Sequence, residues 1–155
     1  MSATIVVDAY YFLNEIFLAV VQGLAEEYSE SELLDAITKA RHKILVTDRA
    51  TGPSIKREYF TEATKRQRVG FGPQLVTVLN QLRVLALIVE PNLPHRAIHA
   101  LGRTQHKIFI EDAVTSRAKY FVTKNKVWHR RDSNKRICPN LTILPAPRFI
   151  RIAGK

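Results

Sequence analysis

The chain of 155 residues is 46% hydrophobic and 25% charged, which is typical of a folded globular protein and excludes the disordered class. This length, without a long Gly, Ser or Pro tract, predicts one domain over residues 1–155 that can bury a core of its own. The single cysteine, Cys138, excludes an internal disulfide and zinc sites built from several cysteines, and it favours a reducing compartment, the cytoplasm. No membrane span is expected at the N-terminus, because its longest uncharged run, residues 16–25, is too short to cross a bilayer.

Positive charge is concentrated in the second part of the chain. The formal net charge is +10, and residues 1–90 carry 10 basic and 11 acidic groups, whereas residues 91–155 carry 14 basic and 3 acidic groups. Such asymmetry is typical of proteins that contact a polyanion, because each Lys or Arg that neutralises a phosphate releases a counterion. The alternative is a basic surface that serves solubility alone.

The first predicted elements are two strands with two helices between them. A β-branched run at 4–7 predicts a strand that ends at Asp8, and the recurrent apolar residues of 9–28 predict a helix directly after it. A capping box over 29–32, with its serine at the cap, predicts a second helix. Residues 44–47 then predict a second buried strand.

Strands and helices continue to alternate in the rest of the chain. The remaining elements are predicted as a helix over 54–67, a helix from Pro73 to 82, a strand at 85–89, a short helix from Pro94 to Gly102, a helix from Thr104 to 118, a strand at 120–123 and a fifth strand in 141–144 or 149–152. A basic loop within 124–140 separates the last two strands.

This alternation predicts an α/β fold with a central, mainly parallel sheet of about five strands. Ligands of such sheets bind beyond the carboxyl ends of the strands. Asp8 follows the first predicted strand and Asn125 follows the fourth, so we expect both at the same edge of the sheet.

Three segments of the sequence, TIVVDAYYF, ILVT with SIKREYFTEA, and EDAVTSRAKYFVTKN, resemble parts of the PIN domain family. Members of this family are compact α/β nucleases that cut RNA with divalent metal ions, and they include the toxins of prokaryotic toxin-antitoxin pairs. The resemblance covers the whole chain and implies a PIN-like three-layer α/β/α domain. It also implies RNA as a substrate and two kinds of protein partner, a second copy of the chain and an antitoxin-like protein.

The resemblance implies a set of catalytic residues at the sheet edge. The first acid of the family falls on Asp8, the second on Glu58, and the acidic or amide residue after the last strand on Asn125. The register of the third acid falls on His106 or Lys107, and Asp112, eleven residues before Thr123, is the alternative. The hydroxyl and amide residues that usually follow the first acid are replaced here by alanine and tyrosine.

These residues indicate a site for Mg²⁺ or Mn²⁺, with Asp8, Glu58, Asp112 and His106 as candidate ligands. Phosphodiester hydrolysis needs ions that generate hydroxide and neutralise charge on phosphate, and hard ions are held by carboxylate oxygens. Because imidazole is a softer donor, His106 would favour Mn²⁺ or a later transition metal over Mg²⁺.

The basic loop predicts contact with single-stranded RNA, which needs cations for phosphates and rings on which bases stack. Its candidate RNA-binding residues are Lys124, Lys126, Trp128, Arg130, Arg131, Lys135 and Arg136. The alternative for Trp128 is a place in the core.

Structural roles compete with the catalytic ones. Asp8 is well placed to be the N-cap of the helix that follows it. Glu58 can be a solvated helix residue paired with a nearby Lys or Arg, Asp112 a residue of a solvated face, and His106 a surface or capping histidine.

The sequence is therefore compatible with two main functions. The first is a metal-dependent endoribonuclease of the PIN type, and the second is a PIN-like domain that has lost catalysis and binds RNA or a protein partner. A third, a structural subunit whose basic face meets an acidic protein, is less favoured.

Overall fold

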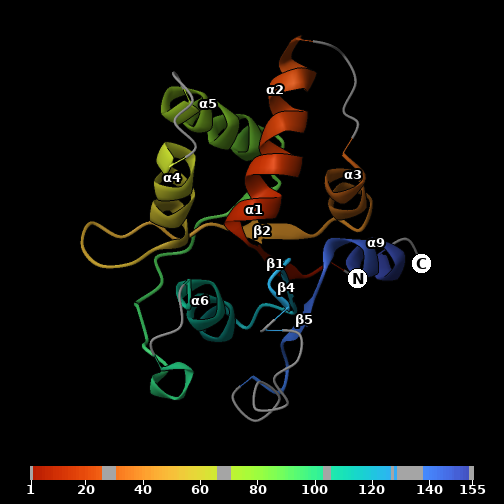
Figure 1. The fold of residues 1–155 in the computed structure, drawn as a ribbon. Coiled ribbons are helices and arrows are strands. Elements are labelled where there is room, and N and C mark those ends of the chain that lie inside the picture. The colour runs from red at the N-terminus through yellow and green to blue at the C-terminus, as the bar shows by residue number, and fades with distance from the viewer. Residues whose placement is uncertain are drawn as a thin grey trace.

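A computed structural model describes residues 2–25, 31–65, 71–102, 106–126, 128 and 138–153. It shows an α/β fold in which helices surround a central sheet (Figure 1). The five strands of the sheet are all parallel, in the order β3-β2-β1-β4-β5. The strands are β1 (Thr4–Val7), β2 (Lys43–Leu45), β3 (Ile88–Val89), β4 (Tyr120–Val122) and β5 (Thr142–Leu144). The predicted parallel sheet of about five strands is confirmed, and the last strand takes the first of its two predicted positions.

Strand β1 lies at the centre of the sheet and is buried on both faces. Ile5 pairs with Ile44 of β2 on one side and with Tyr120 of β4 on the other. The side chains of Ile5, Val6 and Val7 have no exposed surface. A strand whose two faces are both covered by helices needs apolar residues on both faces, and this explains the continuous apolar run from Ile5 to Val7.

Helices cover the sheet to complete a three-layer α/β/α fold. The helical elements are α1 (Ala9–Tyr11), the π-helix η1 (Phe12–Phe17), α2 (Leu18–Ala25), α3 (Glu32–Lys39), α4 (Ile55–Lys65), α5 (Phe71–Val84), the 3-10 turn η2 (His99–Leu101), α6 (Ile108–Ser116) and α9 (Ala146–Ala153). Helix α6 packs on β1 and β4, whereas α3 packs against α9. Within the described ranges, no helix combines the length and the apolar composition needed to cross a membrane.

Helix α3 begins later than the sequence predicted. Its cap is Ser31, whose Oγ accepts a hydrogen bond of 3.1 Å from the N–H of Leu34. The predicted cap, Ser29, lies outside the described residues. Either serine can serve as an N-cap, and the choice between them shifts the start of the helix by two residues, which the local sequence does not decide.

The predicted helix from Pro94 to Gly102 is wrong over most of its length. Residues 90–98 form no regular element, and only η2 is helical before Gly102 ends it with a φ of 64°. Side chains from elsewhere in the chain hold this loop, because Leu93 accepts a hydrogen bond from Arg49 and Ile98 donates one to Glu111. These tertiary bonds occupy backbone groups that a helix would have paired internally.

Candidate functional site

Polar residues from the ends of β1 and β4 lie together at the carboxyl edge of the sheet. The side chains of Asp8, Thr123 and Asn125 line one cavity of about 180 Å³, which we call the sheet-edge cavity. The two strands are neighbours, and the N–H of Asp8 donates to the carbonyl of Val122 at 3.0 Å. The sequence placed Asp8 and Asn125 at one edge, and the structure confirms that placement.

The carboxylate of Asp8 accepts three hydrogen bonds. Its Oδ1 accepts from the N–H of Tyr11 at 2.9 Å, so Asp8 is the N-cap of α1. Its Oδ2 accepts from the hydroxyl of Thr123 at 2.6 Å and from the N–H of Lys124 at 3.0 Å. A carboxylate has about four lone-pair positions, so these bonds fix Asp8 and leave room for one contact to a cation. The capping role is shown, and it is compatible with the ligand role.

The environment of Asp8 disfavours its charge. Burial raises the pKa of Asp8 above its ordinary value of 3.8, although the hydrogen bonds from Thr123, Tyr11 and Lys124 and the nearby His106 oppose this shift. Burial and the negative charge of Asp8 also raise the pKa of Tyr59 well above its ordinary value, and the Tyr59 hydroxyl donates to the carbonyl of Val7 at 2.6 Å. A cation in the cavity would stabilise the ionised carboxylate.

Helix α4 brings two glutamates to His106, on the approach to α6. The Nδ1 of His106 lies 2.8 Å from Oε2 of Glu58, and its Nε2 lies 3.9 Å from Oε1 of Glu62. A carboxylate oxygen of Glu58, a carboxylate oxygen of Glu62 and a ring nitrogen of His106 all lie within 4.8 Å of one another. Glu58 is therefore not merely a solvated helix residue paired with Lys or Arg.

Glu62 is the site residue that the sequence analysis missed. It lines the sheet-edge cavity together with Asp8 and His106, whereas Glu58 reaches the site through its bond to the His106 ring. Residues four apart share a helix face, so the spacing of Glu58 and Glu62 was the signal that could have found it. Its carboxylate also pairs with Lys65 at 3.2 Å.

His106 has a left-handed backbone, with a φ of 62°. Histidine is among the few residues other than glycine that adopt this conformation with some frequency. The chain enters α6 two residues later, at Ile108. Of the candidates for the third position of the site, the structure brings His106 to the cavity.

Asp112 lies elsewhere. Its carboxylate has no exposed surface, so the solvated-face interpretation is wrong, and Asp112 does not line the sheet-edge cavity. Arg49 holds both of its oxygens, at 2.8 and 2.9 Å, and the hydroxyl of Thr47 donates to Oδ2 at 2.6 Å. Because α6 begins at Ile108, Asp112 lies in its second turn, and it serves as a structural anchor.

The neighbouring carboxylate, Glu111, is also fully buried. It accepts a hydrogen bond of 2.7 Å from the N–H of Ile98, and its other oxygen lies 3.2 Å from Nε2 of His95. Glu111 and Asp112, the buried carboxylate pair, thus fasten two separate loops to α6.

The described part of the basic loop gives a mixed result. Lys124 and Lys126 are exposed and flank Asn125, which lines the cavity. Trp128, by contrast, is only 3% exposed and contributes its side chain to the cavity wall. The core alternative for Trp128 therefore holds. The basic residues around Trp128 in the sequence give no sign that its side chain is buried. Arg130, Arg131, Lys135 and Arg136 lie outside the described residues.

The donor set around the sheet-edge cavity suits a divalent cation. Asp8 and Glu62 offer carboxylate oxygens, Asn125 an amide and His106 an imidazole, and these donors favour Mn²⁺ among the hard ions. No protein-family model, no curated protein and no solved structure matches this chain. Function is therefore inferred from the cavity itself.

The raised pKa of Asp8 leads to a prediction about stability. The folded protein keeps a proton on Asp8 at pH values where the unfolded chain has lost it, so stability falls as pH rises from 3.8 through the raised value. We expect the free energy of unfolding of the wild type, relative to Asp8→Asn, to decrease over this window. The decrease should be about 1.4 kcal/mol for each unit by which the pKa is raised.

Urea denaturation at a series of pH values, in the presence of a chelator, measures this difference. Asp35→Asn, at an exposed position on α3, controls for the general effect of removing one negative charge. A wild type that gains stability over Asp8→Asn as pH rises would contradict the prediction.

Proposed function

We propose that this chain is a metal-dependent endoribonuclease of the PIN type that hydrolyses phosphodiester bonds of single-stranded RNA. The observation that carries the proposal is the meeting of Asp8, Glu62, His106 and Asn125 around one small cavity at the carboxyl edge of a parallel sheet. This is where α/β proteins bind their ligands. The resemblance of the sequence to the PIN domain family supports the same conclusion.

The residues of the cavity would divide the work. Asp8 and Glu62 would hold the cation with His106 and Asn125, and the bound cation would supply hydroxide at neutral pH and neutralise charge on the phosphate. Thr123 and the N–H of Lys124 keep Oδ2 of Asp8 in place, while Glu58 orients the His106 ring through Nδ1. Exposed Lys124 and Lys126 would attract the RNA backbone.

Cleavage of a pool of single-stranded RNAs, with Mn²⁺, with Mg²⁺ or with a chelator, tests the proposal. We expect cleavage that needs metal, that is faster with Mn²⁺ because of the imidazole donor, and that falls by more than about 100-fold in Asp8→Asn and in Glu62→Gln. Asp35→Asn should cleave like the wild type, since its side chain is exposed on α3.

Calorimetric titration of Mn²⁺ into the same proteins separates a missing site from a missing substrate. Binding that disappears in Asp8→Asn would support the metal site. A folded wild type that binds no Mn²⁺ at millimolar concentration would overturn the nuclease.

One observation favours a second function, an RNA-binding module without catalysis. Glu58, which matches the second acid of the family, is hydrogen-bonded to His106 and does not line the cavity. RNA binding that needs no metal, without cleavage under any metal condition, would support this module in place of the nuclease.

A further inference from the structure

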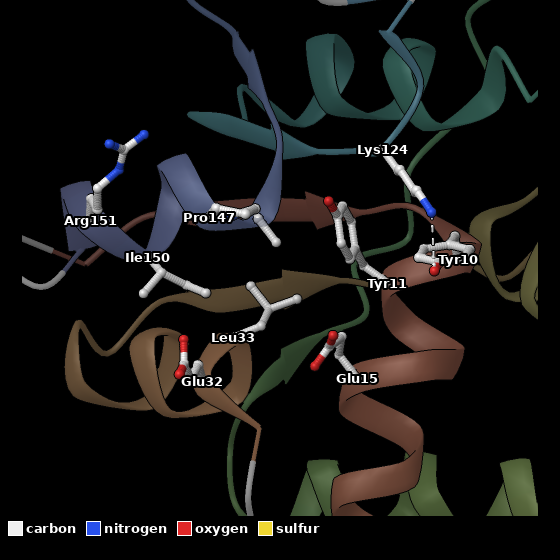
Figure 2. Close-up of a pocket in the computed structure, with 10 residues that line it drawn as sticks. Tyr10, Tyr11, Glu15, Glu32, Leu33, Lys124, Pro147, Ile150 and Arg151 are labelled. Atoms are coloured by element: carbon white, nitrogen blue, oxygen red, sulfur yellow. Dashed lines mark hydrogen bonds between the residues drawn. The ribbon is translucent and has the colours of Figure 1, made fainter.

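A second and larger cavity adjoins the sheet-edge cavity. It has a volume of about 700 Å³ and lies among α1 with η1, α3, α9 and the end of β4 (Figure 2). We call it the helix groove. Tyr10 lines both cavities, and Lys124, which follows Thr123 of the sheet-edge cavity, lines the groove. Anything bound in the groove therefore lies next to the candidate metal ligands.

Charges of opposite sign face each other across the groove. Lys124 and Arg151 lie along its upper side in Figure 2, whereas Glu15 and Glu32 lie along its lower side. Apolar side chains, among them Leu33 and Ile150, lie between these two rows. A ligand that matches this pattern has an anionic edge, a flat apolar body and hydrogen-bond donors on the opposite edge.

An aromatic ring and an ammonium group form the boundary between the two cavities. Tyr10 is 44% exposed, the Nζ of Lys124 lies 4.3 Å from the centre of its ring, and the same Nζ lies 3.2 Å from its hydroxyl oxygen. Single-stranded nucleic acids bind to surfaces of this kind, because bases stack on exposed rings while cations contact the phosphates.

The π-helix explains why a carboxylate lies one turn from that ring. In a π-helix, residue i is bonded to residue i+5, so the turn is wider than that of an α-helix. Tyr10 lies in α1, two residues before η1 begins at Phe12, and Glu15 lies five residues after Tyr10, within η1. Both side chains line the groove, and Glu15 is half-buried, so it can form a hydrogen bond that water competes for only in part.

We propose that the helix groove binds the nucleotide next to the scissile phosphate of a single-stranded RNA. The base stacks on Tyr10, the backbone follows Lys124 toward Arg151, and Glu15 accepts a hydrogen bond from an amino group on the base. This subsite rests on the proposed function, since it takes the same strand that the sheet-edge cavity would cleave. Because cytosine carries an amino group where uracil carries a carbonyl oxygen, Glu15 makes the subsite prefer cytosine.

The test is fluorescence anisotropy of short labelled oligo(C) and oligo(U) RNAs in a chelator, where no metal-dependent cleavage occurs. The wild type should bind oligo(C) about tenfold more tightly than oligo(U). Glu15→Gln should remove this preference, because an amide can also donate to the uracil oxygen. Tyr10→Leu should weaken the binding of both RNAs by about tenfold or more. Tyr10→Phe keeps the ring and should bind both like the wild type.

Two arginines on α9 provide a matched pair for the backbone contact. Arg151 lines the groove, whereas Arg148 is exposed on the same helix and does not line it. Arg151→Gln should reduce the dependence of oligo(C) binding on salt concentration, and Arg148→Gln should leave it nearly unchanged. Thermal unfolding of each variant confirms that a loss of binding does not reflect a loss of folding.

The outcomes separate this inference from the nuclease. If the wild type binds RNA and the variants lose binding or base preference as expected, but no RNA is ever cleaved, the groove is supported as an RNA site and the proposed nuclease activity is overturned. A wild type that cleaves RNA while Tyr10→Leu, Glu15→Gln and Arg151→Gln bind like the parent overturns the subsite alone. Sedimentation that shows a dimer which these variants disrupt also overturns the subsite, since a second copy would then occupy the groove.

Discussion

Arg49→Met is expected to lower the free energy of unfolding by about 3–5 kcal/mol. The substitution removes the guanidinium that contacts both oxygens of Asp112, a carboxylate with no exposed surface, and leaves it with the hydroxyl of Thr47. An unpaired charge in the interior costs far more than an exposed pair contributes. Arg49 also donates to the carbonyls of Leu93 and Pro53, so the loops on both sides lose a contact. Urea denaturation measures the loss.

The same substitution at an exposed ion pair is the matched control. Arg83 pairs with Glu90 at 2.6 Å, but its side chain is 37% exposed, and Arg83→Met should cost at most about 1 kcal/mol. The double variant Arg49→Met with Asp112→Leu should recover much of the lost stability, because two apolar side chains leave no buried charge. Equal losses for Arg49→Met and Arg83→Met would contradict the proposed cause.

Phe12→Ala is expected to cost about 3–5 kcal/mol and to weaken Mn²⁺ binding. The Phe12 ring has no exposed surface and stacks on Tyr59, with centroids 4.0 Å apart and planes 6° from parallel. Tyr59 belongs to α4, which carries Glu58 and Glu62, while Phe12 begins η1, which directly follows α1, the helix capped by Asp8. The ring pair therefore sets the distance between the two helical segments that carry the candidate metal ligands.

Denaturation and calorimetric titration of Mn²⁺ measure the two effects on the same protein. Phe12→Leu, which leaves a smaller cavity, should lose less of each. Val76→Ala, at a position 47% exposed on α5, should change stability by no more than about 0.5 kcal/mol. A Phe12→Ala protein as stable as Val76→Ala would contradict the packing argument.

The sequence predicted those parts of the molecule that depend on local pattern and on the geometry of parallel sheets. The apolar run before Asp8 has the composition of a strand buried on both faces, and parallel strands direct their ends to one edge, so Asp8 and Asn125 could be placed together. The position of His106 depends on a left-handed backbone next to a helix start, which no periodicity reveals.

Residues that act through distant partners could not be predicted in this way. Asp112 was predicted as a candidate metal ligand or as a residue of a solvated face, and neither prediction foresaw a buried ion pair, since charged residues are seldom fully buried. Its partner Arg49 is 63 residues away in sequence, and the residue that binds Glu111 lies in a loop predicted to be helical. The prediction of a helix in this loop and the failure to foresee the burial of Glu111 therefore have the same cause. Glu62 was also missed, but it could have been found, because its spacing of four residues from Glu58 is a local signal.

The central position of β1 also determines when the site can form during synthesis. Asp8 lies 115 residues before Thr123, the residue that fixes its carboxylate, and β1 has no neighbour on that side until β4 has been made. At typical translation rates of about 5–20 residues per second, the first acid waits on the order of ten seconds for its partner. A growing chain that ends before β4 carries Asp8 and both glutamates of α4 without the cavity that joins them. The candidate site can therefore be assembled only when the fold itself is nearly complete.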